Sequence, residues 1–197
     1  MLQVRDDSAS AFEELVARYE QRLVSLMTRL VGRRDMAEDL AQDVFLRVYR
    51  ARKRYVPGSK FSTWMYTIAH NVAANALRSL ARRPEVNLVG SESGEQRGNP
   101  MDATALAASG LMPTRQLEKA ELSEVVNMAV TALNERQRMA VLLNKFEHLS
   151  YEEIAEVMEL TPAAVKSLLS RARANLREVL DPYLKQGSKI VDSDEPS

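Results

Sequence analysis

The stretch LSYEEIAEVMELTPAAVKSLLSRARANLR, residues 149–177, determines the fold of the C-terminal part of the chain. Ser150 and Glu153 have the spacing of a capping box, a side-chain pair that starts a helix. Thr161 followed by Pro162 starts a second helix, because proline at the first helical position removes an N–H that has no intrahelical partner. Two short capped helices joined by a tight turn are typical of a helix-turn-helix.

The second of these helices has an apolar side and a basic side. Helical phasing places one set of residues on the apolar side: Val165, Leu168, Leu169, Ala172 and Leu176. From Thr161 to Arg177 there are four basic residues and no acidic residue. Such a helix can enter the major groove of DNA, although a solvated basic face on a helical hairpin is the alternative interpretation. The candidate DNA contacts are Lys166, Ser167, Ser170, Arg171 and Arg173.

Apolar residues in the rest of the chain also recur at intervals of three and four, which favours helices over strands. The predicted helices cover residues 11–30, 35–55, 60–83, 118–133 and 134–146. Residues 85–114 contain four of the seven glycines and no aromatic residue, which is typical of a linker. The sequence therefore predicts an all-α protein with two small helical domains, 1–84 and 118–184, a flexible linker, 85–117, and a disordered tail, 185–197.

The predicted helix at residues 60–83 lies in a long basic stretch. Between Val44 and Pro84 there are nine Lys or Arg residues and no acidic residue. Helical phasing places the only tryptophan, Trp64, on a polar and basic stripe. Aromatic and basic side chains together suit single-stranded nucleic acid, but a large aromatic residue at the edge of the core is an equally good interpretation. The candidate residues are Lys60, Phe61, Trp64, Asn71, Arg78 and Arg82.

A third candidate surface lies on the predicted helix 35–55 and is acidic. Its residues are Asp39, Gln42, Asp43 and Leu46. Carboxylates would repel DNA, whereas an acidic patch that includes an exposed leucine can contact another protein. Taken alone, a solvated face with one stray leucine is the simpler interpretation.

The composition argues against several classes of function. The chain has no cysteine, which excludes a disulfide, a thiolate nucleophile and a cysteine-built zinc site. Its two histidines, His70 and His148, have neither metal-ligand spacing nor a nucleophile partner. No segment approaches the roughly 18 to 20 apolar residues of a membrane span. We therefore expect a cytoplasmic protein that is not an enzyme and uses no cofactor or metal.

Four stretches together resemble a bacterial RNA polymerase sigma factor of the extracytoplasmic-function type. They are AFEELVARYEQRL, DMAEDLAQDVFLRVYRA, FSTWMYTIAHNVAANALRS and LNERQRMAVLLNKFEHLSYEEIAEVMELTPAAVKSLLSRARANLRE. They cover nearly all of residues 11–180 except the linker, in the order and spacing of the family. The resemblance implies promoter-specific transcription initiation, with a first domain for the polymerase and the −10 element and a second for the −35 element.

The resemblance also implies roles for the three surfaces. The acidic helix around Asp39 and Asp43 docks on the coiled coil of the largest polymerase subunit. The loop at residues 56–60 and the helix after it hold the opened −10 strand, with a flipped base in the loop. The basic helix enters the −35 major groove, and an anti-sigma factor regulates the protein. Positions where the family often has arginine or aspartate hold other residues here: Leu168, His70 and Asn75.

Two other functions fit the same residues. A dimeric helix-turn-helix repressor or activator would bind a palindromic operator without polymerase. A purely structural helical adaptor would show no dependence on nucleic acid. Transcription in vitro with purified core polymerase separates the three hypotheses.

Overall fold

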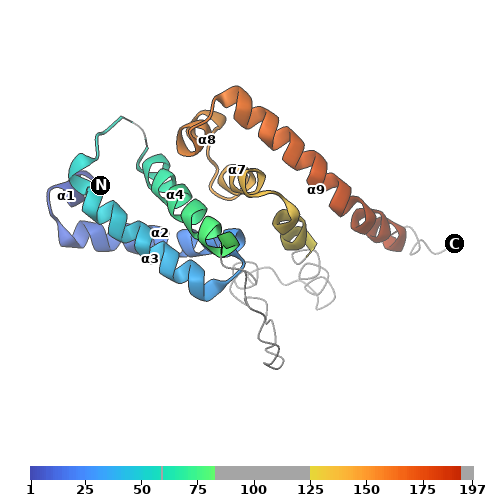
Figure 1. Cartoon of the computed structure of the whole chain (residues 1–197), viewed down its shortest axis with the longest axis horizontal. Coiled ribbons are helices and arrows are strands. Elements are labelled where there is room, and N and C mark those ends of the chain that lie inside the picture. Colours follow the sequence, from blue (N-terminus) through green and yellow to red (C-terminus); the bar gives the residue numbers. More distant parts are fainter. Residues whose placement is uncertain (59, 83–124, 192–197) are drawn as a thin grey trace.

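The computed structural model describes residues 1–58, 60–82 and 125–191, and the side chains up to residue 183. Within these ranges the chain folds into helices without a strand, in two helical parts (Figure 1). The predicted all-α class is therefore confirmed. The predicted linker, 85–117, and the start of the helix predicted at 118–133 lie outside the described residues.

The first domain is built from helices α1 to α4. Ser8 starts α2, because its hydroxyl accepts a hydrogen bond from the Ala11 N–H at 3.3 Å. Gly32 ends α2 with a left-handed φ of 76°, a conformation that glycine adopts without strain, and α3 then packs back against α2. The elements are α1 (Leu2–Arg5), α2 (Ala9–Val31), α3 (Arg34–Ala51), the 3-10 turn η1 (Arg52–Arg54) and α4 (Phe61–Arg82).

The second domain contains a helical segment at 125–132, followed by α7 (Glu135–Lys145), α8 (Tyr151–Met158) and α9 (Pro162–Val191). Each of the last three helices has the cap that the sequence predicts. The Asn134 side chain accepts from the Gln137 N–H at 2.9 Å. The capping box of Ser150 is complete, and Thr161 caps α9 by accepting from the Ala164 N–H at 3.2 Å.

Helix α9 is longer than the sequence-based domain boundary allows. It continues through Pro182 to Val191, so the boundary predicted at residue 184 falls inside the helix rather than at its end. Residues 192–197 of the predicted tail lie outside the described residues. The leucine, lysine and glutamine after Pro182 are good helix formers, which is consistent with this extension.

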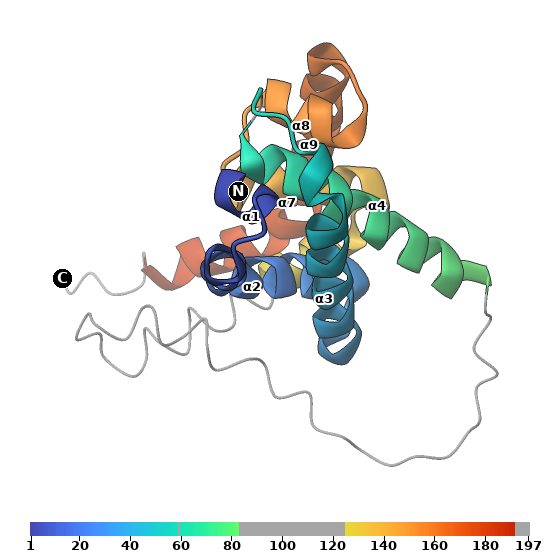
Figure 2. The ribbon, with the colours of Figure 1, turned by 90° about the vertical axis from the view of Figure 1, so that its left-hand side faces the viewer.

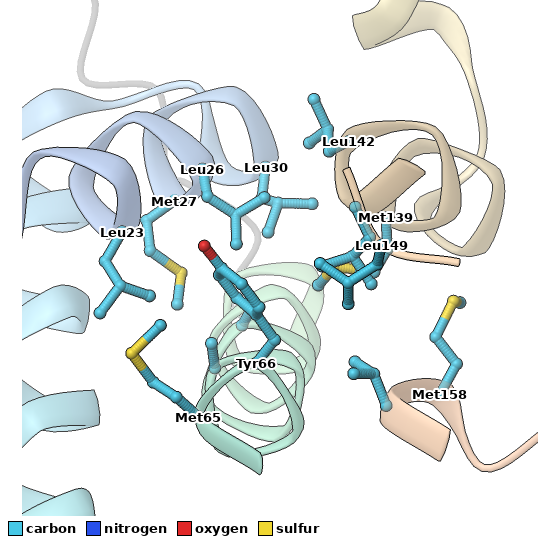
Figure 3. Packing of buried hydrophobic residues seen from close by; sticks show 14 of the residues in the cluster. Leu23, Leu26, Met27, Leu30, Met65, Tyr66, Met139, Leu142, Leu149 and Met158 are labelled. Atoms are coloured by element: carbon cyan, nitrogen blue, oxygen red, sulfur yellow. The ribbon is translucent and has the colours of Figure 1, made fainter. Parts of the chain in front are cut away.

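The two domains are in contact, and α4 lies between α2–α3 and the second domain (Figure 1). Figure 2 shows α8 beside the N-terminal end of α4, where Lys60 Nζ lies 2.9 Å from Glu153 Oε1. Buried residues of both domains form one continuous apolar cluster. In Figure 3, Tyr66 lies between leucine and methionine side chains of α2 and residues of the second domain, including Met139 and Leu149. The relative placement of the two domains therefore depends on side-chain packing.

Truncating the apolar side of α9 should destabilise the second domain. Leu169 is 2% exposed, so Leu169→Ala should lower the free energy of unfolding by roughly 2–5 kcal/mol through lost burial and a cavity. The neighbouring Ser170 is exposed, and Ser170→Ala should change the free energy by less than about 0.5 kcal/mol. Denaturant unfolding followed by circular dichroism measures both. Equal effects of the two substitutions would contradict the observed packing of α9.

Candidate nucleic-acid and protein interfaces

The exposed side of α9 brings together the candidate DNA contacts of the second domain. Val165 and Ala172 are fully buried, which orients the helix and leaves the opposite side open. Arg171 Nη2 donates to Ser167 Oγ at 3.2 Å, so these two side chains support one another along the helix. All five predicted contacts are exposed: Lys166, Ser167, Ser170, Arg171 and Arg173.

Two further features of this surface depend on the structure. Arg173 Nη2 donates to the Tyr151 hydroxyl at 2.8 Å, which ties α9 to α8. Leu168, where the family often has arginine, is half-buried and packs against the core, so it belongs to the apolar side.

Arg177 is exposed and falls on the same side as Lys166 and Ser170 by helical phasing. Arg177 is not among the contacts predicted from the sequence, although its spacing of seven residues from Ser170 places it on the same side of the helix.

The N-terminal end of α4 contains an aromatic cluster. The Trp64 ring centroid lies 5.3 Å from that of Tyr55 and 6.1 Å from that of Phe61, and Phe61 also contacts Tyr19 at 5.5 Å. Trp64 and Phe61 are half-buried against the core. Trp64 therefore occupies the edge of the core, and its remaining exposed area leaves part of the ring accessible. Lys60, next to this cluster, is exposed and pairs with Glu153.

The other candidates on α4 lie further along the same helix. Asn71, Arg78 and Arg82 are exposed and fall on one stripe with Trp64. Because α-helices rise 1.5 Å per residue, this stripe extends about 27 Å from Trp64 to Arg82. The residues therefore form an elongated surface rather than a compact site. Arg78 Nη2 donates to Asn75 Oδ1 at 2.7 Å, which holds the guanidinium along the helix.

A cavity of about 340 Å³ lies between α4 and α7, at the domain boundary. Its lining includes His70 and Arg78 from α4 and Glu135 from α7. Burial lowers the pKa of His70, although the nearby carboxylates of Glu135 and Glu159 oppose this shift. The cavity therefore lies between a half-buried histidine of the first domain and charged side chains of the second.

The acidic side of α3 borders an apolar groove between α2 and α3. The groove has a volume of about 360 Å³, and Gln42 and Leu46 belong to its lining. Asp39 and Gln42 are exposed, and Leu46 is 53% exposed. Asp43 is half-buried and pairs with Arg47, whose Nη2 lies 2.9 Å from its Oδ2. The other lining residues are Phe12, Val16, Glu20, Val24, Glu38, Ala41 and Phe45.

This groove changes the interpretation of the third surface. A solvated helix face with a stray leucine would present isolated side chains, but here Leu46 continues an apolar surface contributed by α2. Side chains such as Phe12 and Val16 come from a helix that the sequence does not connect to Asp39. The arrangement offers an apolar groove with carboxylates at its edge, which fits a protein contact better than a nucleic-acid contact.

The described residues contain no group of three or more histidine, aspartate or glutamate side chains arranged to hold a metal ion. In the same part of the chain, every helix is too short or too polar to cross a membrane.

Two family models match the chain. Sigma-70 region 2 matches residues 15–83, and Sigma-70, region 4 matches residues 123–176. The first match includes the candidate surfaces of α3 and α4, and the second includes the helix-turn-helix. The two matches flank the segment predicted to be a linker.

Similar proteins match over most of their length. The RNA polymerase sigma-H factor of Pseudomonas aeruginosa is 34% identical over 176 residues, which are 89% of both chains. The ECF RNA polymerase sigma-E factor of Escherichia coli strain K12 is 32% identical over 186 residues, which are 93% of both chains. The similarity to each of these two proteins therefore extends over both domains of the chain.

Solved structures show the same fold. The sigma factor RpoE in complex with the anti-sigma factor NepR from Bartonella quintana has a TM-score of 0.64 and 24% identity, and covers 88% of this chain and 98% of that one. CnrH in complex with the cytosolic domain of CnrY has a TM-score of 0.64 and 22% identity. This match covers 92% of this chain and 94% of that one. At these identities the likeness concerns the fold alone.

Proposed function

The chain belongs to the sigma-70 family of RNA polymerase sigma factors, in its extracytoplasmic-function type, and we propose a division of labour among three of its helices. As a sigma factor it binds core RNA polymerase and directs promoter-specific transcription initiation. The observation that carries this conclusion is the match of regions 2 and 4 in one chain, with relatives that are similar over about nine-tenths of their length.

Helix α9 reads the −35 element. Its N-terminal turns present hydroxyl and cationic side chains on one exposed side, and no acidic residue lies between Thr161 and Arg177. Arg171 can donate two hydrogen bonds to a guanine in the major groove. Lys166 and Arg177 are placed to neutralise phosphates, which orient the helix without reading sequence. Arg173 is positioned by Tyr151, because its hydrogen bond to this hydroxyl of α8 holds the guanidinium in place.

Helix α4 and the loop before it hold the opened −10 strand. The exposed part of Trp64 offers a surface on which a base can stack, while Lys60 supplies a positive charge beside it. Asn71 adds hydrogen-bonding capacity, and Arg78 and Arg82 follow the backbone further along the helix. Phe61 supports this surface from within the aromatic cluster.

Helix α3 contacts core polymerase. Gln42 and Leu46 line the groove, together with the carboxylates of Glu20 and Glu38, and Asp39 and Asp43 follow on the same helix. A partner helix with apolar and basic residues would fit the groove and the acidic side chains. The coiled coil of the largest polymerase subunit is the partner that the family resemblance indicates. Asp43 already pairs with Arg47, and it would exchange that partner or share it on binding.

The location and the regulation of the protein follow from its binding to core polymerase and promoter DNA. Core polymerase and promoter DNA are in the cytoplasm of bacteria, so we place the protein there. No step of chemistry is assigned to the chain, because polymerase performs the reaction. An anti-sigma factor is the expected regulator, and co-expression followed by a pulldown should recover it as a small partner.

Transcription in vitro tests the function directly. Purified core polymerase with this chain should produce a transcript from a promoter selected out of random DNA, and core polymerase alone should not. A dimeric repressor or activator would instead bind a palindromic operator without polymerase. A structural adaptor would neither bind DNA nor change the amount of transcript. Absence of a promoter-dependent transcript, with active core polymerase confirmed, would reject the proposed function.

The role of Arg171 predicts a change in sequence preference. Arg171→Ala should weaken −35 binding by the holoenzyme by roughly 1–3 kcal/mol and relax selectivity at one base pair. Lys166→Ala should weaken all sequences about equally and reduce the salt dependence of binding. Competition binding on a set of single-base variants of the −35 element measures both. If Arg171→Ala weakens all sequences equally, Arg171 does not read a base.

The groove on α3 predicts a loss of polymerase affinity. Asp39→Ala combined with Gln42→Ala should reduce core binding by about tenfold or more, because both side chains are exposed at the edge of the contact. Gln3→Ala combined with Asp6→Ala is a matched control, since both residues are also exposed, Gln3 in α1 and Asp6 directly after it. Fluorescence titration with core polymerase measures both affinities. Unchanged affinity of the first variant would reject the assignment of this surface.

A further inference from the structure

The segment that precedes α2 is attached to the first domain by one apolar residue and one charged residue. Val4 of α1 is 1% exposed and belongs to the apolar core. Asp7, two residues after α1, is the charged residue, and its carboxylate contacts η1, the 3-10 turn that follows α3. The N-terminal segment is therefore held against the part of the chain that leads into α4 (Figure 1).

Two cations of η1 share the Asp7 carboxylate. Arg52 donates to Asp7 Oδ1 from Nε at 2.8 Å, and its Nη2 lies 2.8 Å from the same oxygen. Lys53 Nζ lies 2.5 Å from Asp7 Oδ2 and also donates to the Arg5 carbonyl oxygen at 2.7 Å. The hydrogen bonds from Lys53 and Arg52 lower the pKa of Asp7, so its carboxylate stays charged at neutral pH. A single exposed ion pair contributes little, but two cations on one carboxylate form a network that fixes their geometry.

The backbone at Asp7 does not by itself require an aspartate. Its φ is 68°, in the left-handed region, which glycine adopts without strain and which aspartate tolerates better than most other residues. The Asp7 N–H donates to the Val4 carbonyl oxygen at 3.1 Å, and the next residue, Ser8, caps α2. Glycine would satisfy the same turn. The contribution that only the carboxylate makes is the contact with η1.

The turn η1 connects this contact to the aromatic cluster of α4. Arg52 Nη1 donates to the Tyr49 carbonyl oxygen at 2.8 Å, and the guanidinium lies over the Tyr49 ring, 4.0 Å from its centroid. The Arg52 carbonyl oxygen accepts from the Tyr55 N–H at 3.2 Å. Tyr55 is 8% exposed, and its ring packs against that of Trp64. The position of Asp7 is thus transmitted to Trp64 through one hydrogen-bonded turn.

Removal of the Asp7 carboxylate would have two opposite effects on DNA binding. A carboxylate beside a basic surface repels phosphates, so its removal would strengthen binding of any sequence. A carboxylate that fixes η1 also places Tyr55 and Trp64, so its removal would weaken binding of the correct −10 sequence. The Asp7 side chain is 53% exposed, and salt screens repulsion between exposed charges over about 8 Å. The placement of side chains is not screened, so we expect the second effect to dominate on the correct sequence.

We propose that Asp7 is a positioning residue for the −10 surface, which fixes η1 through Arg52 and Lys53 and thereby places the aromatic cluster that contains Trp64. The effect on DNA rests on the proposed function of α4, whereas the fixing of η1 does not. Selectivity for the −10 strand then depends in part on the segment before α2, to which no contact with DNA is assigned.

Removal of the carboxylate tests the fixing of η1. Asp7→Gly removes both ion pairs and keeps the left-handed turn. Asp6→Ala is the matched control, since it removes one negative charge from the adjacent exposed residue. Hydrogen exchange at the Tyr55 amide should accelerate about threefold or more in Asp7→Gly, while α3 amides around the buried Val48 keep the wild-type rate. Unchanged exchange at Tyr55, or an equal acceleration in Asp6→Ala, would overturn the proposal.

Further variants show whether the effect passes through η1. Arg52→Gln combined with Lys53→Gln should accelerate exchange at Tyr55 as Asp7→Gly does. Asp7→Gly added to this pair should cause no further change, because the effects of residues that share one contact are not additive. Trp64 is the only tryptophan, and acrylamide should quench its fluorescence more strongly in the same variants. A further acceleration on adding Asp7→Gly would contradict the proposed route.

The role in −10 selectivity is tested with the full chain bound to core polymerase. The probe is a promoter fragment selected from random DNA, with its −10 strand unpaired, and the competitor carries the same −10 bases in scrambled order. Asp7→Gly should lower the preference for the selected strand about fivefold, while the affinity for the scrambled strand stays equal or rises slightly.

The two parts of the proposal fail in different ways. A preserved preference in Asp7→Gly would overturn the positioning role, even where exchange at Tyr55 shows that η1 is loosened. Absence of any preference in the wild type would instead reject the proposed −10 surface, and with it the role of Asp7 in selectivity. The exchange measurements contain no DNA, so they decide independently whether Asp7 fixes η1.

Discussion

The relative placement of the two domains depends on how one buried charge is compensated. A carboxylate removed from water is unfavourable unless hydrogen bonds and an opposite charge replace its hydration. Glu147 obtains both from the other domain, through Arg22 and Tyr66. Its neighbours then follow: Leu149 contributes to the shared core, and α8 is held against α4. The positions of the proposed −35 and −10 surfaces relative to each other follow from this contact.

The three proposed surfaces use one structural device with different chemistry. Each is the exposed side of an amphipathic helix whose apolar side is buried, so its orientation is set by packing. Helix α9 carries cations, α3 carries carboxylates beside an apolar groove, and α4 combines an aromatic edge with cations. A net charge of zero is thus the sum of separate surfaces that we propose for DNA and for polymerase. Such segregation lets one small chain meet an anion and a protein at once.

Local sequence signals predicted the local structure well. The caps at Asn134, Ser150 and Thr161 form as expected, because a cap involves a side chain and an N–H only three residues away. The helix boundaries were less predictable. The helix predicted to reach residue 55 ends at Ala51 and continues as a 3-10 turn, and α9 extends past residue 184. Helix ends depend on weak competition between similar backbone states, which residue patterns describe poorly.

The sequence by itself determined the all-α class, the helix-turn-helix and the candidate contact residues on α3, α4 and α9, because helical phasing depends only on the order of residues. The tertiary structure alone decided that Gln42 and Leu46 border a groove with α2, and that Trp64 packs at the edge of an aromatic cluster. It alone also brought Arg22 and Tyr66 to Glu147, which lies 125 and 81 residues further along the chain. No local pattern encodes such pairings, because they arise only when the apolar sides of separate helices are buried together.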